Sequence, residues 1–143
     1  MRKVTTWMTP VLALACASCN NIYPVSGKVM YNGSPAAGAT VFFIRQGGGS
    51  SAEAAIMSIV QEDGSFELVC GSLGKGAPPG NYDVLIEWKP VSGQSKGRPQ
   101  HGADVLKGRY ADRKHPLLHA TVESRATHLP PFELTDEGPV QNR

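Results

Sequence analysis

Hydrophobic and polar residues alternate in short stretches along most of the chain. The clearest alternation covers 82–88, in which one face carries Tyr82, Val84, Ile86 and Trp88. A period of two predicts a β-strand. Similar β-branched and aromatic runs occupy 25–31, 40–44, 56–61, 66–70, 117–122 and 132–134. No stretch holds a helical period over three turns, so the pattern predicts about seven short strands.

Turn sequences separate these runs. Asn32-Gly33 follows the run 25–31 directly, and Asp63-Gly64 separates 56–61 from 66–70; both dipeptides favour hairpin turns. The 16 Gly and 11 Pro among 143 residues also fit many turns and few long helices. The chain therefore predicts an all-β fold, a single antiparallel β-sandwich. Its expected core is Val25, Val29, Val41, Phe43, Ile56, Val60, Phe66, Leu68, Tyr82, Val84, Ile86, Val122 and Phe132.

The segment 89–114 differs in character from the rest of the chain. It contains seven basic residues and two acidic ones, several glycines and no sustained apolar period. We expect a long exposed loop there. Its basic side chains could touch anionic phospholipid or polysaccharide, but a solvated loop is the simpler interpretation.

The first 19 residues have the pattern of a targeting segment. Arg2 and Lys3 precede an apolar stretch, 4–15, that is too short to span a membrane. Leu12-Ala13-Leu14-Ala15-Cys16 resembles a bacterial lipobox, which implies cleavage before Cys16 and transfer of diacylglycerol to its thiol. Cys19 is the alternative lipidation site, and an ordinary secretory signal is the alternative to both.

These features predict an order of segments along the chain. Residues 1–15 are the expected signal peptide, 16–22 a lipidated tether, 23–135 the β-sandwich and 136–143 a flexible tail. The formal charge of +2 falls to zero once Arg2 and Lys3 are removed. A neutral mature protein has little electrostatic attraction for phosphate backbones, so we expect no nucleic-acid partner. Cys70 is expected to be a small apolar strand residue, with a disulfide to Cys19 as the alternative.

Four stretches resemble a known family: YPVSGKVMYNGSPAAGATVFF (23–43), EDGSFEL (62–68), GKGAPPGNYDVLIEW (74–88) and GRYADRKHPLLHATV (108–122). Together they are similar to bacterial lipoproteins that carry a carboxypeptidase regulatory-like domain of transthyretin-like shape. The resemblance implies a β-sandwich, export and a non-catalytic role. The related transthyretin-like hydrolases end in Y-R-G-S. This chain ends in PVQNR, so that activity is not carried over.

Few residues have the spacing of a chemical site. His115 and His119 are four apart, but Pro116 between them argues against a shared helical face for a metal. The segment 71–76 (GSLGKG) lacks the first glycine and the Ser/Thr of a phosphate loop. We therefore expect no enzyme, no cofactor and no metal. A small hydrolase that uses His115 is the remaining catalytic alternative.

The sequence thus favours a non-catalytic, lipid-anchored β-sandwich that serves as a binding or structural module. We expect it in the cell envelope, facing the periplasm or on the outer membrane, with secretion as the alternative. Its expected partner is the membrane, through the anchor; a protein or glycan partner is left unknown. The rival function is a carbohydrate-binding module, in which Trp88 and Tyr110 would stack on a sugar ring. Trp88 shares the parity of buried residues, which favours burial instead.

Overall fold

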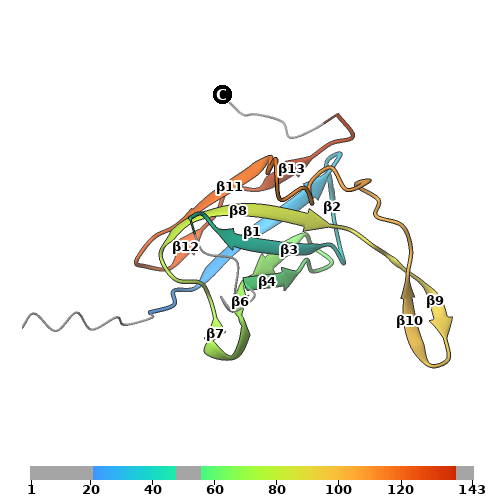
Figure 1. Cartoon of the computed structure of the whole chain (residues 1–143), viewed down its shortest axis with the longest axis horizontal. Coiled ribbons are helices and arrows are strands. Elements are labelled where there is room, and N and C mark those ends of the chain that lie inside the picture. Colours follow the sequence, from blue (N-terminus) through green and yellow to red (C-terminus); the bar gives the residue numbers. More distant parts are fainter. Residues whose placement is uncertain (1–20, 48–55, 138–143) are drawn as a thin grey trace, which may run out of the picture.

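A computed structural model describes residues 21–47 and 56–137, which form a nearly all-β molecule (Figure 1). The larger sheet has the strand order β11-β8-β3-β4-β6-β7 and is antiparallel throughout. Its strands are β3 (Thr40–Arg45), β4 (Ile56–Ile59), β6 (Val69–Cys70), β7 (Gly74–Lys75), β8 (Gly80–Glu87) and β11 (Leu118–Val122). A short 3-10 turn, Gly71–Leu73, joins β6 to β7.

The second sheet is built around β1 (Val25–Tyr31). Its other strands are β2 (Ser34–Pro35), β5 (Ser65–Glu67), β12 (Thr127–His128) and β13 (Phe132–Leu134). The strands β2 and β5 run antiparallel to β1, whereas β12 and β13 run parallel to it. The expected β-sandwich is confirmed, but this sheet is mixed rather than purely antiparallel. Parallel strands need a long crossover connection between them. Here the chain between β1 and β12 forms the larger sheet before it returns to pair with β1.

The core lies between the two sheets and matches the alternation of the sequence. Of the thirteen expected core residues, all but Phe132 are buried, and Phe132 is half-buried against the same cluster. The expected list missed nine further residues that complete this core, among them small residues, loop residues and two strand leucines. They are Ala36, Ala39, Cys70, Ala77, Leu106, Tyr110, Leu118, Leu129 and Leu134.

Both predicted turns are present. Asn32 and Gly33 have φ values of 48° and 83°, as a type I′ turn requires, and Gly64 has a φ of 84°. At the second turn, the Gln61 amide donates a hydrogen bond to the Ser65 carbonyl (2.8 Å). Further from the turn, β4 pairs with β6, with Met57 opposite Val69. Between these points β5 pairs with β1 instead. This hairpin therefore bridges the two sheets.

The segment 89–114 is not simply an exposed loop, which corrects the expectation from composition. Its first part forms an exposed hairpin of β9 (Val91–Ser95) and β10 (Arg98–His101), which extends away from the sandwich in Figure 1. Its second part is organised by Asp104, whose carboxylate accepts hydrogen bonds from the amides of Trp88, Leu106 and Gly108. This arrangement buries Leu106 and Tyr110 against the core.

Candidate functional site

Trp88 lies just after β8 at one end of the sandwich and is half-buried. Its indole Nε1 donates a hydrogen bond to the Ala37 carbonyl at 2.9 Å. Its ring meets the Tyr31 ring edge-on, with centroids 5.5 Å apart and an interplanar angle of 77°. The side chain therefore has a structural role at this end, and a part of it stays accessible.

A small polar cluster adjoins these two rings. The Tyr31 hydroxyl donates to one carboxylate oxygen of Asp136, and the Asn32 amide donates to the other at 3.3 Å. The hydrogen bond to Asp136 raises the pKa of Tyr31. The same bond lowers the pKa of Asp136, helped by the positive charges of Lys107 and Arg109. Asp136, the first residue of the expected flexible tail, is thus tied to the β1 turn.

Tyr110 does not form a platform for a ligand, which corrects the suggestion made from sequence. Its side chain is 2% exposed. The hydroxyl donates to the Thr135 carbonyl (3.2 Å) and accepts from the Thr135 amide (3.1 Å). An apolar ring whose only polar atom is already bonded to the main chain is a core residue.

His115 and His119 are held by separate acidic residues. His119 stands on β11 opposite Asp83 on β8, with Nδ1 2.9 Å from the carboxylate, and His115 lies 3.1 Å from Asp112. Since β11 begins at Leu118, the two imidazoles share no helical face. Among the residues that the structure describes, no group of His, Cys, Asp and Glu is arranged to hold a metal ion.

Of the three cysteines, Cys70 lies within the residues that the structure describes. Cys70 is buried in β6 opposite Ile56, as an apolar strand residue would be. Cys16 and Cys19, the two candidate lipidation sites, lie outside the described residues, and so does any test of the Cys19–Cys70 disulfide. No helix within 21–47 and 56–137 is long and apolar enough to cross a membrane.

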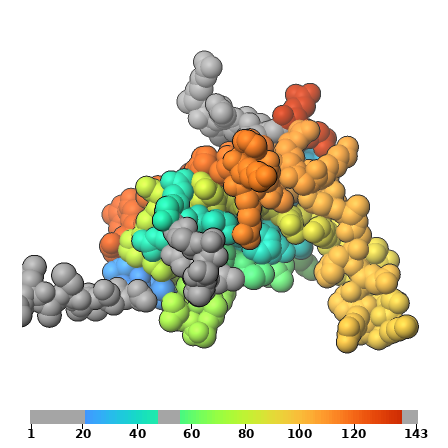
Figure 2. Space-filling model, viewed as in Figure 1, coloured from blue at the N-terminus to red at the C-terminus, as the bar shows by residue number. Residues whose placement is uncertain are grey.

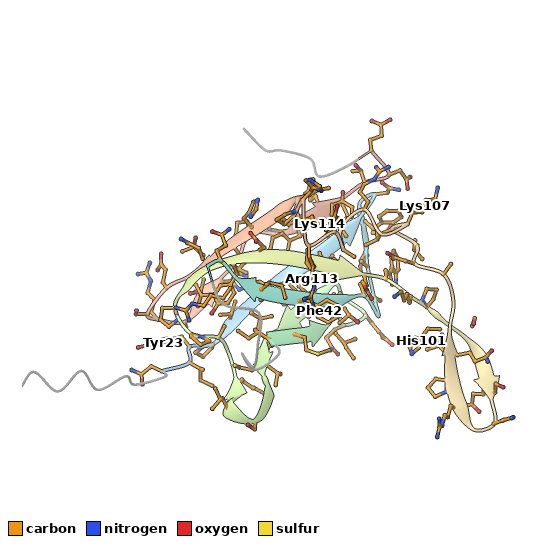
Figure 3. The ribbon with its side chains drawn as sticks, in the orientation of Figure 1. Tyr23, Phe42, His101, Lys107, Arg113 and Lys114 are labelled. Atoms are coloured by element: carbon orange, nitrogen blue, oxygen red, sulfur yellow. The ribbon has the colours of Figure 1, made fainter. Side chains whose placement is uncertain are left out.

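The outer face of the larger sheet carries an apolar row that the sequence pattern did not single out. Cross-strand pairing aligns Leu85, Phe42, Met57 and Val69 from β8 to β6. The segment after Asp104 covers the first two, because Ala111 and Arg113 line one small crevice with Phe42 and Leu85. In Figure 3 Arg113 lies across the ribbon close to Phe42.

The other half of this row stays open to solvent. We call Met57, Ile59, Val69 and Leu73 the apolar edge patch; their exposed fractions are 36%, 57%, 41% and 51%. The first three line a groove of about 480 Å³ between β4 and the β5–β6 segment. The signal available in the sequence was that both faces of 56–59 (IMSI) carry apolar residues, Ile56 on one face and Met57 and Ile59 on the other. Which face would be left open depends on the loop that covers the neighbouring strands.

No family model matches this sequence, and no curated protein matches it. Among solved structures, the chain is similar to a 9R-lipoxygenase from Cyanothece PCC8801, with a TM-score of 0.46 and 11% identity. That match covers 94% of this chain and 18% of the lipoxygenase. The chain is also similar to a DUF3823 family protein from Parabacteroides merdae ATCC 43184, with a TM-score of 0.37 and 13% identity over 79% of this chain and 44% of the other. The chain therefore spans less than half the length of either protein, and at these TM-scores neither similarity assigns a chemistry to it.

Proposed function

We propose that this protein is a lipoprotein of the bacterial cell envelope, anchored through Cys16, whose β-sandwich is a non-catalytic binding or structural module. The observation that carries the proposal is the lipobox-like LALAC at the end of a basic-then-apolar leader. A lipoprotein's diacylglycerol supplies two acyl chains, which is enough for stable anchoring. The carboxypeptidase regulatory-like resemblance belongs to the same proposal.

The position of Tyr23, near the start of the described residues, supports this arrangement. Within 21–47 and 56–137, Tyr23 is the earliest residue bonded to the domain through its main chain, exchanging two amide hydrogen bonds with Ala77 at 3.0 Å. Seven residue steps separate it from Cys16. A chain of that length spans at most about 25 Å when fully extended. An acylated Cys16 would therefore hold the sandwich close to the bilayer.

The non-catalytic part of the proposal rests on how the polar side chains are used. The Asp104 carboxylate is bonded to main-chain amides, and the Tyr110 hydroxyl to the main chain of Thr135. His119 and Gln46 both contact the Asp83 carboxylate on the surface of the sheet. These polar groups hold loops and strands together, so their hydrogen bonds support the fold. This use of the polar side chains favours a structural or binding role.

Labelling with radioactive palmitate tests the anchor. We expect the full-length protein and the Cys19→Ala variant to incorporate label and to sediment with membranes, and the Cys16→Ala variant to lose both properties. Cys19→Ala is the matched control, because it removes a neighbouring thiol from the same segment. Label that disappears only in Cys19→Ala would move the anchor to that residue. No label on the wild-type protein would leave a secreted domain.

Glycan binding at the Tyr31–Trp88 end is the second candidate function. Its support is the pair of partly accessible aromatic rings beside the amide of Asn32 and the carboxylate of Asp136. If the site binds a sugar, added soluble peptidoglycan fragments should quench Trp88 emission in a saturable way, and Asn32→Ala should weaken that response. Unchanged emission at all concentrations would exclude stacking of these fragments on Trp88.

A further inference from the structure

The large hydrophobic side chains that are exposed lie mostly in the apolar edge patch. Six large hydrophobic side chains are exposed among the described residues, and four of them form this patch. Single exposed hydrophobic residues are normal on a protein surface, whereas large apolar patches mark interaction surfaces. Met57, Ile59 and Val69 line one groove together, and Leu73 lies beyond Val69 in the turn after β6. Met57 and Val69 are direct cross-strand partners, and Ile59 lies two residues further along the same face of β4. Leu73 projects from the turn that follows β6.

The patch adjoins the point where the chain enters the sandwich. Ile22 approaches Gly74 closely, with its Cδ1 3.8 Å from the position that a Cβ on Gly74 would take. Gly74 directly follows Leu73, and Tyr23 pairs with Ala77 three residues later. Figure 2 shows the lime-green β6–β7 lobe projecting beside the blue start of the described chain.

A basic side chain borders the patch on the same face of the sheet as Val69. Lys75 on β7 is the cross-strand partner of Val69, and its side chain is 79% exposed. Its ammonium lies 3.4 Å from the carboxylate of Glu67, an exposed surface pair that contributes little to stability. A lysine beside apolar residues can bury its methylene stem and keep its charge among lipid headgroups.

We propose that the apolar edge patch rests on the lipid bilayer, with Leu73 inserted among the headgroups and Lys75 beside them. This inference depends on the proposed anchor at Cys16, which places the patch within a short tether of the lipid. Tethering makes the second contact intramolecular, so a small apolar surface is sufficient. The other end of the row would then remain covered by the segment around Arg113.

The local backbone favours lipid over a second copy of the chain. The larger sheet ends at β11 on one side and at β7 on the side of the patch, and β7 has only two residues. Strands this short are a common way to prevent edge-to-edge pairing between molecules. Side-chain insertion into a bilayer needs no such ladder, because the lipid headgroups and water satisfy the polar atoms around it.

Contact quenching by brominated acyl chains tests the proposal. The lipidated protein, expressed from the full-length chain, is reconstituted into vesicles of phosphatidylcholine and phosphatidylglycerol, with and without bromine on the acyl chains. A tryptophan is placed by Leu73→Trp, and the matched control is Val91→Trp, another exposed apolar position on the β9–β10 hairpin. The parent protein supplies the background emission of Trp88. Unchanged circular dichroism establishes that each variant is folded, and Val69→Trp replaces Leu73→Trp if that variant is not.

We expect bromine to remove about half of the added emission of Leu73→Trp, since an interfacial residue lies at the headgroup–acyl boundary. The emission of Val91→Trp and of the parent should be unchanged. Equal quenching of the two introduced tryptophans, or none, would overturn the proposal. Shielding of the tryptophan in Leu73→Trp by a second copy, detected as a cross-linked dimer, would do the same. Palmitate label on Cys16 is measured on the same preparation, so a missing label identifies failure of the anchor separately.

Discussion

Replacing Gly76 with alanine is expected to lower the free energy of unfolding by about 3–5 kcal/mol, as backbone strain and steric overlap add together. Gly76 has a φ of 122°, a conformation that residues with a side chain rarely adopt. A Cβ there would lie 2.2 Å from the Tyr23 carbonyl oxygen and 2.6 Å from its carbon. Both are main-chain atoms, so no side-chain rotation relieves the overlap.

The surrounding hydrogen bonds prevent the two segments from moving apart cheaply. The Gly76 amide donates to the Leu68 carbonyl at 2.7 Å, and Ala77 exchanges two bonds with Tyr23. The variant must break these bonds or expel the start of the chain from the sandwich. Detachment of Tyr23 would also separate the proposed tether from the apolar edge patch.

Urea unfolding followed by circular dichroism measures this loss. The control is Gly33→Ala, because Gly33 also has a positive φ (83°) but its Cβ would meet nothing within 4 Å. We expect that substitution to cost about 1 kcal/mol, the conformational part alone. Equal losses in the two variants would show that the contact with Tyr23 contributes nothing.

Phe66→Ala is expected to destabilise the protein by about 3–5 kcal/mol, the usual cost of truncating a buried aromatic residue. Phe66 is 1% exposed and lies on β5. Its ring is 6.4 Å from the Phe43 ring and stacks on Phe132 at 6.2 Å. Since Phe43 belongs to the larger sheet and Phe132 to the smaller, removing this ring weakens the contact between them.

The space for this ring is created by Gly27 on the adjacent strand. A Cβ on Gly27 would lie 2.8 Å from the tip of the Phe66 ring. Gly27→Ala should therefore destabilise the wild-type protein and cost less in the Phe66→Ala background. Urea unfolding of the four proteins gives a coupling energy, as in a double-mutant cycle. Additive losses would contradict the idea that the glycine accommodates the ring. Phe132→Ala, at a half-buried position, is the control and should cost less than Phe66→Ala.

The strands and most of the core followed from local patterns. The alternation over 82–88 predicted β8, and 25–31 and 132–134 matched β1 and β13 in both bounds. Period-two burial is a local property, because successive side chains point to opposite faces. The Asn32-Gly33 turn was equally local, since its positive φ values depend on two residues.

The candidate site residues were harder to assign, because their roles depend on distant partners. Tyr110 lies in a polar, basic segment, but its hydroxyl forms hydrogen bonds with the main chain of Thr135 and its ring is buried in the core. Trp88 shares the parity of buried residues and is nevertheless only half-buried, against Tyr31 and Ala37. Neither environment is encoded within the few residues around each side chain.

The sequence by itself determined an all-β chain, the positions of its main strands and turns, and the alternation that builds its core. Only the tertiary structure decided that β12 and β13 run parallel to β1, because strand pairing across the domain depends on the path of the whole chain. It also decided which apolar residues stay open. Leu85 and Met57 occupy the same row, and the Asp104-anchored segment covers one and leaves the other exposed. Covering of that kind is a contact between residues far apart in sequence, and periodicity carries no information about it.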